Sequence, residues 1–294
     1  MGRRLVAALQ RQGSVVRALT RRPGAARLPA GVELRAWDGA SIEREALRGA
    51  DAVVHLAGEP VFGGVPTAEK RRRMRESRVA SSAAIADALG AIPASERPHA
   101  LVCASAVGYY GDRGEERLDE ASPPGAGFLA DLCVAWEEAA ARAEAFGVRR
   151  TSLRIGVVLA GEGGALAPLV RLFRLGLGGR VGSGQQWFPW VHVDDVVRLI
   201  LASLERDDFR GPINAVAPQA ARNADFTRAL ARAVHRPALF AVPAFALRLA
   251  LQDLSIELLG SRLVAPAYAL ERGFAFAYPQ LEVALAAELA RRSG

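Results

Sequence analysis

The chain has 294 residues, of which 51% are hydrophobic and 23% charged, and its formal net charge is +7. This composition is that of a globular protein with a large core, and it excludes a disordered chain. Two cysteines without metal-ligand spacing, no apolar run of membrane-spanning length and no signal-peptide pattern predict a reduced, cytoplasmic protein without a metal.

Strand-like and helix-like patterns alternate along most of the chain. The predicted strands are 14–19, 32–36, 51–58, 100–105 and 149–158. The predicted helices are 3–12, 42–48, 67–89, 128–146, 165–177 and 196–205. Strands and helices that alternate at this spacing form right-handed crossovers, so we expect an α/β fold with a Rossmann-like, doubly wound parallel sheet.

The alternation becomes less regular after Gly161, where aromatic and proline-rich stretches follow. We therefore expect a nucleotide-binding domain over residues 1–160. Residues 161–294 are expected to form mostly a smaller substrate-binding region with a helical C-terminal segment, interleaved with the end of the sheet.

The chain begins in a predicted helix, whereas a doubly wound nucleotide domain begins with a strand and a glycine-rich turn. Gly2 matches the last glycine of such a turn, with the first strand absent. We expect the DNA upstream of Met1 to encode, in frame, about ten to fifteen residues, with a β-branched run followed by Gly-x-x-Gly. The alternative is a natural variant that no longer binds a dinucleotide.

Small or polar residues end two of the predicted strands. Leu56, Ala57 and Gly58 close one of them, and Ser105 closes another. Open parallel sheets bind ligands at the carboxyl ends of their strands, and small residues there let the backbone approach a nucleotide. The pattern indicates a nucleotide site. A plain tight turn at 56–58 and a buried, backbone-bonded serine are the structural alternatives.

The positive charge does not form a pattern typical of nucleic-acid binding. Its densest run, Lys70 to Arg73, is interleaved with Glu69 and Glu76 at helical spacing. A solvated helix face is favoured over a phosphate-contacting patch. We expect neither a nucleic acid nor a membrane as partner.

Several short stretches, weak singly, together resemble a known family. They are Thr20-Arg-Arg-Pro23, His55-Leu-Ala-Gly-Glu-Pro60, Glu76-Ser-Arg-Val79, Ser105-Ala-Val-Gly-Tyr-Tyr-Gly111, Trp136-Glu137, Trp190-Val-His-Val-Asp-Asp195 and Tyr278-Pro279. The chain is similar to the extended short-chain dehydrogenases/reductases. Within them it resembles the atypical, SDR39U1-like branch of NAD-dependent epimerase/dehydratase proteins, with the C-terminal segment typical of that branch.

The resemblance implies a nicotinamide dinucleotide cofactor. After the second strand of a complete domain, an acidic residue binds the ribose 2′-hydroxyl and an arginine accommodates a 2′-phosphate. Arg21 and Arg22 occupy that place, so NADP is favoured over NAD. Other cofactor-binding residues implied by the resemblance are Gly2, Asp38, Leu56, Ala57, Gly58 and Ser105. Solvated loop arginines and an aspartate in a turn are the structural alternatives.

The resemblance also implies hydride chemistry, but the usual proton-transfer pair is missing. The family's Tyr-x-x-x-Lys pair belongs on helix 128–146, where Leu129 and Cys133 stand instead. Ser105 corresponds to the active-site serine, and Tyr109 or Tyr110 is the candidate acid. We expect an NADP-dependent oxidoreductase or epimerase-like enzyme acting on an unknown small molecule. The alternative is a catalytically silent NADP-binding regulator linked to cell division.

Two further segments are given structural roles. His192 with Asp194 and Asp195 has the spacing of an oriented imidazole, but either aspartate suits the N-cap of helix 196–205, and this role is favoured. Extended relatives dimerise by packing helices 67–89 and 128–146 as a four-helix bundle. Apolar side chains around Trp136 therefore favour a homodimer.

Overall fold

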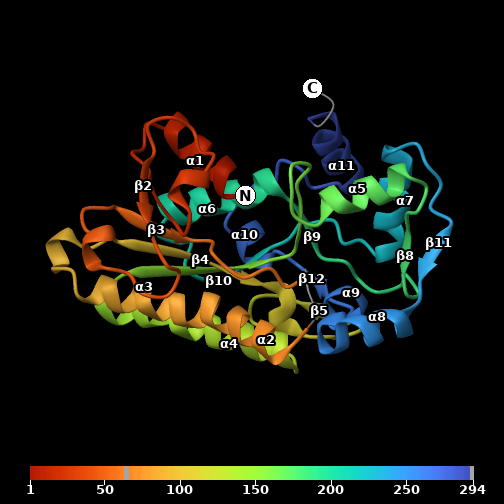
Figure 1. The fold of residues 1–294 in the computed structure, drawn as a ribbon, viewed down its shortest axis with the longest axis horizontal. Helices are drawn as coiled ribbons and strands as arrows, with labels where there is room; N and C mark the ends of the chain where they lie inside the picture. Colours follow the sequence, from red (N-terminus) through yellow and green to blue (C-terminus); the bar gives the residue numbers. More distant parts are fainter. Residues whose placement is uncertain (63–65, 292–294) are drawn as a thin grey trace. The chain divides into compact units, whose positions relative to one another are not determined.

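The computed structural model describes residues 1–62 and 66–291 (Figure 1). Two compact units divide the chain. The first contains Met1–Ser105, Val134–Leu153 and Val197–Pro212, and the second contains Ala106–Cys133, Arg154–Val196 and Ile213–Gly294. This division differs from the expected boundary at residue 160, because each unit takes segments from both sides of it. Among the described residues, no helix has the length and hydropathy needed to span a membrane.

The predicted parallel strands are present, arranged in two sheets. One sheet pairs β1 (Arg17–Thr20) with β2 (Glu33–Ala36). The other has the order β10-β6-β4-β3, with bounds Gly211–Ala215, Arg149–Ile155, Ala100–Ala106 and Ala52–His55. In the described residues no strand joins β1 to β3, which is where a complete doubly wound sheet has its first strand. The α/β, Rossmann-like parallel fold is confirmed.

Helices cover the sheets as predicted. In Figure 1, α3 and α4 run along one side of the strands, and α1 and α6 lie on the other side. The helices are α1 (Gly2–Arg11), α2 (Ala68–Arg75), α3 (Ser81–Gly90), α4 (Phe128–Ala141), α5 (Leu166–Arg174), α6 (Val193–Glu205), α7 (Asn223–Ala233), α8 (Ala244–Leu251), α9 (Ile256–Leu259), α10 (Ala267–Glu271) and α11 (Leu281–Ala290). The predicted helix 42–48 is only a 3₁₀ turn, Arg44–Ala46.

The predicted helix 67–89 is helical throughout but widens in its middle. The Thr67 hydroxyl accepts the Lys70 N–H and caps α2. Between α2 and α3, Glu76–Ala80 form a π-helical turn in which the Ser81 hydroxyl donates to the Ser77 carbonyl oxygen. A serine hydroxyl that donates to a helical carbonyl oxygen competes with the backbone N–H groups for that acceptor. A π-helical turn changes the direction of the side chains around it.

The same serine reaches a buried histidine at the end of β3. His55 Nε2 lies 2.9 Å from Ser81 Oγ, and the residue is only 3% exposed. Burial, with the nearby positive charge of Arg78, lowers the pKa of His55 from 6.5 to about 4. The folded chain therefore holds a neutral imidazole here.

Trp136 is buried within the first unit. Its Nε1 donates to Ser82 Oγ at 3.0 Å, and the Arg78 guanidinium lies 5.1 Å from its ring centroid. The expected apolar patch around Trp136 is therefore wrong, since only 5% of the residue is exposed. The homodimer stays a prediction without this support.

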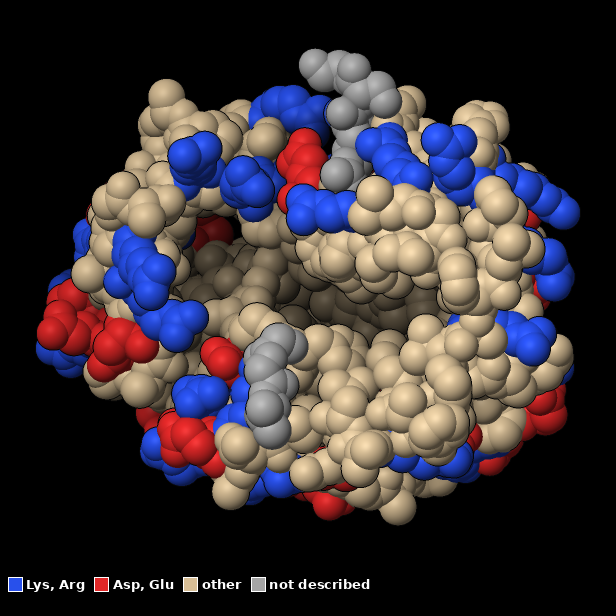
Figure 2. Space-filling view, turned by 45° about the vertical axis from the view of Figure 1, so that its right-hand side comes forward, with Lys and Arg blue, Asp and Glu red and all other residues tan. Residues whose placement is uncertain are grey.

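The charge of the basic run is balanced locally. Arg72 pairs with Glu69 and with Glu76 one turn later, and Arg73 pairs with Glu69. All these side chains are about half exposed, as a solvated helix face requires. Figure 2 shows basic side chains spread over the face in view, with acidic ones among them.

Small paired strands and helices build the second unit. The pairs are β7 (Val157–Leu159) with β9 (Trp190–His192), β8 (Gly179–Val181) with β11 (Phe240–Val242), and β5 (Arg117–Leu118) with β12 (Leu263–Val264). Helices α5, α7 and α11 contribute to one apolar core, which includes Phe173, Phe226 and Leu285.

Helix α6 begins at Val193, so the predicted N-cap role of Asp194 or Asp195 is wrong. Both aspartates stand inside the first turn instead, where their negative charges interact favourably with the helix dipole. The Asp195 carboxylate accepts the N–H groups of Ala277 and Tyr278 at 2.7 and 2.9 Å. It thereby anchors the segment before α11.

Acidification should destabilise the fold through His55. Between pH 6.5 and pH 4 the unfolded chain binds a proton that the folded chain does not, so the free energy of unfolding falls as the pH falls through this window. In urea titrations across the window, His55→Gln should show a weaker pH dependence than the wild type. The exposed His99→Gln is the matched control, and equal pH dependence of all three proteins would contradict the prediction.

Gly125 should tolerate no larger residue. A Cβ there would stand 2.1 Å from the Tyr110 carbonyl oxygen, whereas nothing lies within 4 Å of the same position at Gly163. Overpacking of this kind costs about 1–3 kcal/mol or more. We expect Gly125→Ala to lower the midpoint of thermal unfolding clearly more than Gly163→Ala does, and a similar change for both variants would refute the steric argument.

Candidate functional site

The carboxyl ends of the strands lie close together in the first unit. The rings of His55, which ends β3, and Trp37, which follows β2, are edge-on with centroids 5.8 Å apart. Beyond β3, Ala57 and Gly58 are exposed. A Cβ on Gly58 would stand 3.3 Å from the Arg78 guanidinium carbon, so a larger residue at this position would press on the arginine side chain. The exposed backbone of Gly58 therefore lies beside the Arg78 guanidinium, which donates to the Glu59 carbonyl oxygen.

The two arginines after β1 are available to a ligand. Arg21 and Arg22 are exposed, and their side chains make no hydrogen bond or ion pair with residues 1–62 and 66–291. Guanidinium groups of this kind bind phosphate through paired N–H donors.

Asp38, after β2, is occupied by its own turn. Its carboxylate accepts the N–H groups of Ala40 and Ser41 and the Ser41 hydroxyl, and these hydrogen bonds lower its pKa. This matches the structural alternative stated for Asp38. Of the other predicted cofactor residues, Leu56 is half-buried, and Gly2 is the exposed first residue of α1.

Ser105 has a partner that the sequence did not reveal. Its hydroxyl donates to Glu137 Oε1 at 2.7 Å, and Ser105 is only 3% exposed. Glu137 lies on α4, four residues after Cys133. The serine proton is used in the hydrogen bond to the carboxylate. The lone pairs of Ser105 Oγ therefore remain to accept a hydrogen bond from a ligand. The pair can therefore hold or pass a proton.

Leu129 and Cys133 are the residues at which the family resemblance predicts the tyrosine and lysine positions. Both are buried on α4, and Cys133 lies in the core, as the sequence predicted. Neither side chain hydrogen-bonds as a tyrosine hydroxyl or a lysine ammonium does. In this region α4 contributes packing.

The two candidate tyrosine acids occupy different surroundings. The Tyr110 hydroxyl is buried, 2.7 Å from Asn214 Oδ1, and accepts from Arg154 Nη1 at 3.0 Å. Burial raises the pKa of Tyr110 to about 12. This placement argues against the predicted catalytic role of Tyr110, because its hydroxyl is committed to the fold. Tyr109 is half-buried with Arg154 3.5 Å from its ring centroid. Arg113, the arginine that follows the two tyrosines in the same loop, pairs with Glu116.

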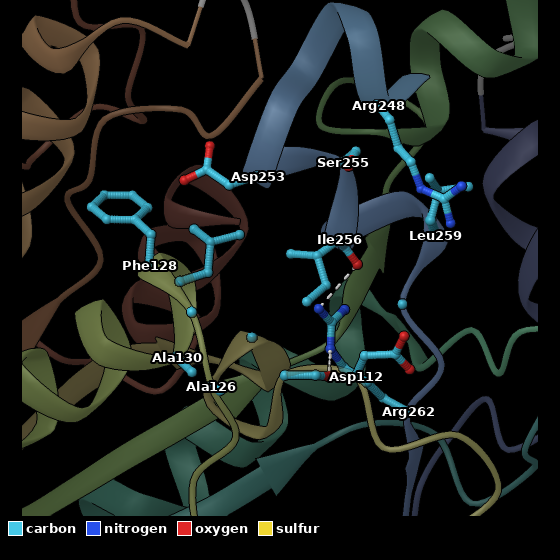
Figure 3. A pocket seen from close by; sticks show the side chains of 15 residues that line it. Asp112, Ala126, Phe128, Ala130, Arg248, Asp253, Ser255, Ile256, Leu259 and Arg262 are labelled. Carbon is cyan, nitrogen blue, oxygen red and sulfur yellow. Dashed lines mark hydrogen bonds between the residues drawn. The ribbon is translucent and has the colours of Figure 1, made fainter. Parts of the chain in front are cut away.

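The second unit contains a cavity of about 330 Å³ (Figure 3). The start of α4 lines it with Phe128 and Leu129, and the C-terminal segment lines it with Ile256 and Arg262. The Arg262 guanidinium is 3% exposed and donates to the carbonyl oxygens of Gly111 and Ile256. Arg248 and Asp253 add charges from the same segment. The cavity therefore has an apolar wall with a few fixed polar groups, as small-molecule sites do.

The region around His192 is structural. His192 Nε2 lies 3.0 Å from Glu288 Oε1, both side chains are fully buried, and the ring stacks on Tyr278. With Asp194, they form a group whose potential metal-ligand atoms all lie within 4.8 Å of one another. Arg291 Nη1 already lies 2.9 Å from Asp194 Oδ2 and 3.2 Å from Glu288 Oε1, so a guanidinium supplies the balancing charge.

Comparison with known proteins places this chain among relatives of matching length. It is 38% identical over 294 residues to "Epimerase family protein SDR39U1 homolog, chloroplastic" of Arabidopsis thaliana, covering 98% of this chain and 83% of that protein. It is 36% identical to epimerase family protein ML0860 of Mycobacterium leprae, covering 100% and 94%. The crystal structure of human epimerase family protein SDR39U1 (isoform2) with NADPH matches with a TM-score of 0.88 and 32% identity, covering 97% and 94%.

Two family models divide the chain between them. Residues 242–288 match a domain of unknown function, DUF1731, which includes α8, α9 and most of α11. Residues 1–216 match the NAD dependent epimerase/dehydratase family model. Since this match covers most of the chain and the relatives agree over its full length, the chain belongs to the NAD dependent epimerase/dehydratase family.

Proposed function

We propose that this protein is an NADP-dependent oxidoreductase or epimerase-like enzyme that acts on a small molecule in the cytoplasm. The observation that carries the proposal is the pair of exposed guanidinium groups of Arg21 and Arg22, which have no polar partner among the described residues. They belong to the same unit as the exposed residues Ala57 and Gly58. Both cysteines are buried and neither is in a disulfide within residues 1–62 and 66–291, which suits a reducing compartment.

The residues after β1 and β2 fit NADP better than NAD. A 2′-phosphate needs a cation where a 2′-hydroxyl needs a carboxylate. The two residues after Thr20 are arginines, while the Asp38 carboxylate is hydrogen-bonded within its own turn. The human relative solved with NADPH supports the same choice. When bound, the cofactor would supply or accept a hydride.

Ser105 and Glu137 would handle a proton or orient a substrate oxygen. With its own proton donated to Glu137, the Ser105 hydroxyl can accept from a substrate hydroxyl. The Ser105 hydroxyl can donate to a substrate carbonyl only after its hydrogen bond to Glu137 has broken. The pair therefore suits an alcohol that is oxidised or an alcohol product that is released.

A catalytically silent NADP-binding regulator, linked to cell division, is the second candidate. Leu129 and Cys133 favour it, because they remove the usual proton-transfer pair from α4. The committed Tyr110 hydroxyl favours it as well.

Two measurements separate these candidates. NADPH binding is followed by its fluorescence, and turnover by NADPH absorbance with the aromatic aldehyde 4-nitrobenzaldehyde as probe. Binding with turnover supports the enzyme, whereas binding without turnover supports the regulator. A protein that binds no NADPH would exclude both.

Replacing both Arg21 and Arg22 with alanine should weaken NADPH binding by about 1.5–3 kcal/mol for each charge-assisted hydrogen bond that the substitution removes. NADH binding should hardly change, because NADH lacks the 2′-phosphate. Arg27→Ala, an exposed arginine in the same loop, is the control. Equal weakening of both cofactors would show that the two arginines do not recognise the phosphate.

Ser105→Ala should lower aldehyde turnover by about 100-fold while leaving the NADPH dissociation constant within about twofold. The reason is that the hydroxyl acts on the substrate oxygen, whereas the arginines hold the cofactor. Steady-state rates and fluorescence titrations of the same preparation provide the test. A loss of binding equal to the loss of rate would assign Ser105 to the cofactor site instead.

A further inference from the structure

We propose that Arg78 binds the pyrophosphate of the nicotinamide cofactor, beside the exposed backbone of Gly58. The inference rests on the proposed function, because a pyrophosphate is present only if a dinucleotide binds. It assigns a ligand to the π-helical turn Glu76–Ala80. All the groups that it uses belong to the first unit.

The Arg78 guanidinium lies close to the chain that follows β3. A Cβ built on Gly58 would stand 3.3 Å from both Arg78 Cζ and Arg78 Nη2. Gly58 is exposed and Arg78 is half-buried, so both can be reached from solvent. Open parallel sheets bind ligands at the carboxyl ends of their strands. A ligand that lies on the Gly58 backbone would therefore meet a positive charge.

The order of the strand ends favours the pyrophosphate over the other anionic group of NADPH. Arg21 and Arg22, after β1, are the groups proposed for the 2′-phosphate, and Ser105, at the end of β4, is the group proposed for the substrate oxygen. β3 pairs with β4, and the Trp37 ring after β2 contacts the His55 ring at the end of β3. The end of β3 thus lies between the two places. The pyrophosphate is the anionic part of the cofactor that joins its adenosine half to its nicotinamide half.

Neutral groups hold the guanidinium in place. Arg78 Nη2 donates to the Glu59 carbonyl oxygen at 2.9 Å, and Nη1 donates to the Met74 carbonyl oxygen at 3.3 Å. Arg78 Cζ lies 5.1 Å from the centroid of the Trp136 ring, whose Nε1 donates to Ser82 Oγ. These contacts orient the guanidinium without cancelling its charge. A preoriented guanidinium loses little side-chain entropy when it binds a phosphate.

The π-helical turn holds Arg78 and the chain after Gly58 together. Ser77 Oγ accepts the Glu59 N–H at 2.9 Å, while Arg78 donates to the Glu59 carbonyl oxygen. Both polar groups of the Glu59 backbone are therefore bound by this one turn. Turns of this kind occur frequently at functional sites, where they change the direction of a side chain.

The ionisable groups nearest to Arg78 have other roles. The Glu59 carboxylate lies 3.4 Å from Lys70 Nζ and 3.6 Å from Arg73 Nε, so it balances these two cations. His55 is neutral at neutral pH, because burial and the charge of Arg78 lower its pKa to about 4. An anion on the Gly58 backbone would therefore be bound by the Arg78 guanidinium rather than by a protonated imidazole.

The test measures the dissociation constants of NADPH and NADH for the full chain in about 50 and about 500 mM KCl. Arg78→Gln removes the charge and keeps an amide that can donate to the Glu59 carbonyl oxygen. Loss of the charge-assisted contact should weaken the binding of both cofactors by about 10- to 100-fold. NADH carries its negative charge only on the pyrophosphate, so added salt should weaken its binding to the wild type clearly more than its binding to Arg78→Gln. Arg75→Gln, which replaces an exposed arginine at the end of α2, should behave as the wild type.

Three results would overturn the inference. The first is unchanged affinity of Arg78→Gln for both cofactors. The second is weaker binding with the salt dependence of the wild type, because Arg78 would then support the turn and not meet the phosphate charge. The third is weaker binding of NADPH alone, which would place Arg78 at the 2′-phosphate.

Thermal unfolding of each variant checks the fold. If Arg78→Gln does not fold, Arg78→Met, which keeps an apolar stem beside Trp136, is measured with the same expectation. If the wild type binds NADPH but not NADH, the salt dependence of NADPH binding decides in the same way. A wild type that binds neither cofactor would overturn the proposed function itself.

Discussion

The need to pair one buried cation organises the cavity of the second unit. Arg262 is almost fully removed from solvent, and a guanidinium in that position is stable only with fixed acceptors around it. Gly111, before β5, and Ile256, at the start of α9, supply backbone acceptors, and Glu257 supplies the negative charge. The loop after β4 and the C-terminal helices are held together as a result, and the pairing of β5 with β12 continues the same connection.

Buried polar groups join remote segments elsewhere in the second unit as well. Glu120 accepts the backbone N–H groups of Asn214 and Tyr268, and burial raises its pKa. His192 and Glu288 meet inside the core. A buried polar group without a partner costs about 1–3 kcal/mol, so each pairing favours one arrangement of these segments over others. The Glu120 carboxylate is a poor candidate for chemistry, because its hydrogen bonds to these two N–H groups are already formed.

The side chains of helix α4 differ in the contacts that they make. Leu129 and Cys133 pack, while Glu137 engages Ser105 in the first unit. In the second unit, the Glu257 carboxylate borders the space beside Leu129 and Cys133. Proton transfer requires a titratable group in position rather than a particular residue type, and a carboxyl group meets that requirement as a tyrosine does.

The sequence by itself determined the strands, most of the helices and the absence of the tyrosine-lysine pair, because periodicity and residue identity are local properties. It also placed Arg21, Arg22, Ala57 and Gly58 at strand ends, since parallel strands end at one edge of a sheet. Only the tertiary structure decided that Ser105 meets Glu137, that Tyr110 is committed to Asn214, that Trp136 is buried, and that Glu257 reaches Gly108. Each of these contacts joins residues far apart in the chain. Their formation depends on how whole elements pack, and no local pattern records that.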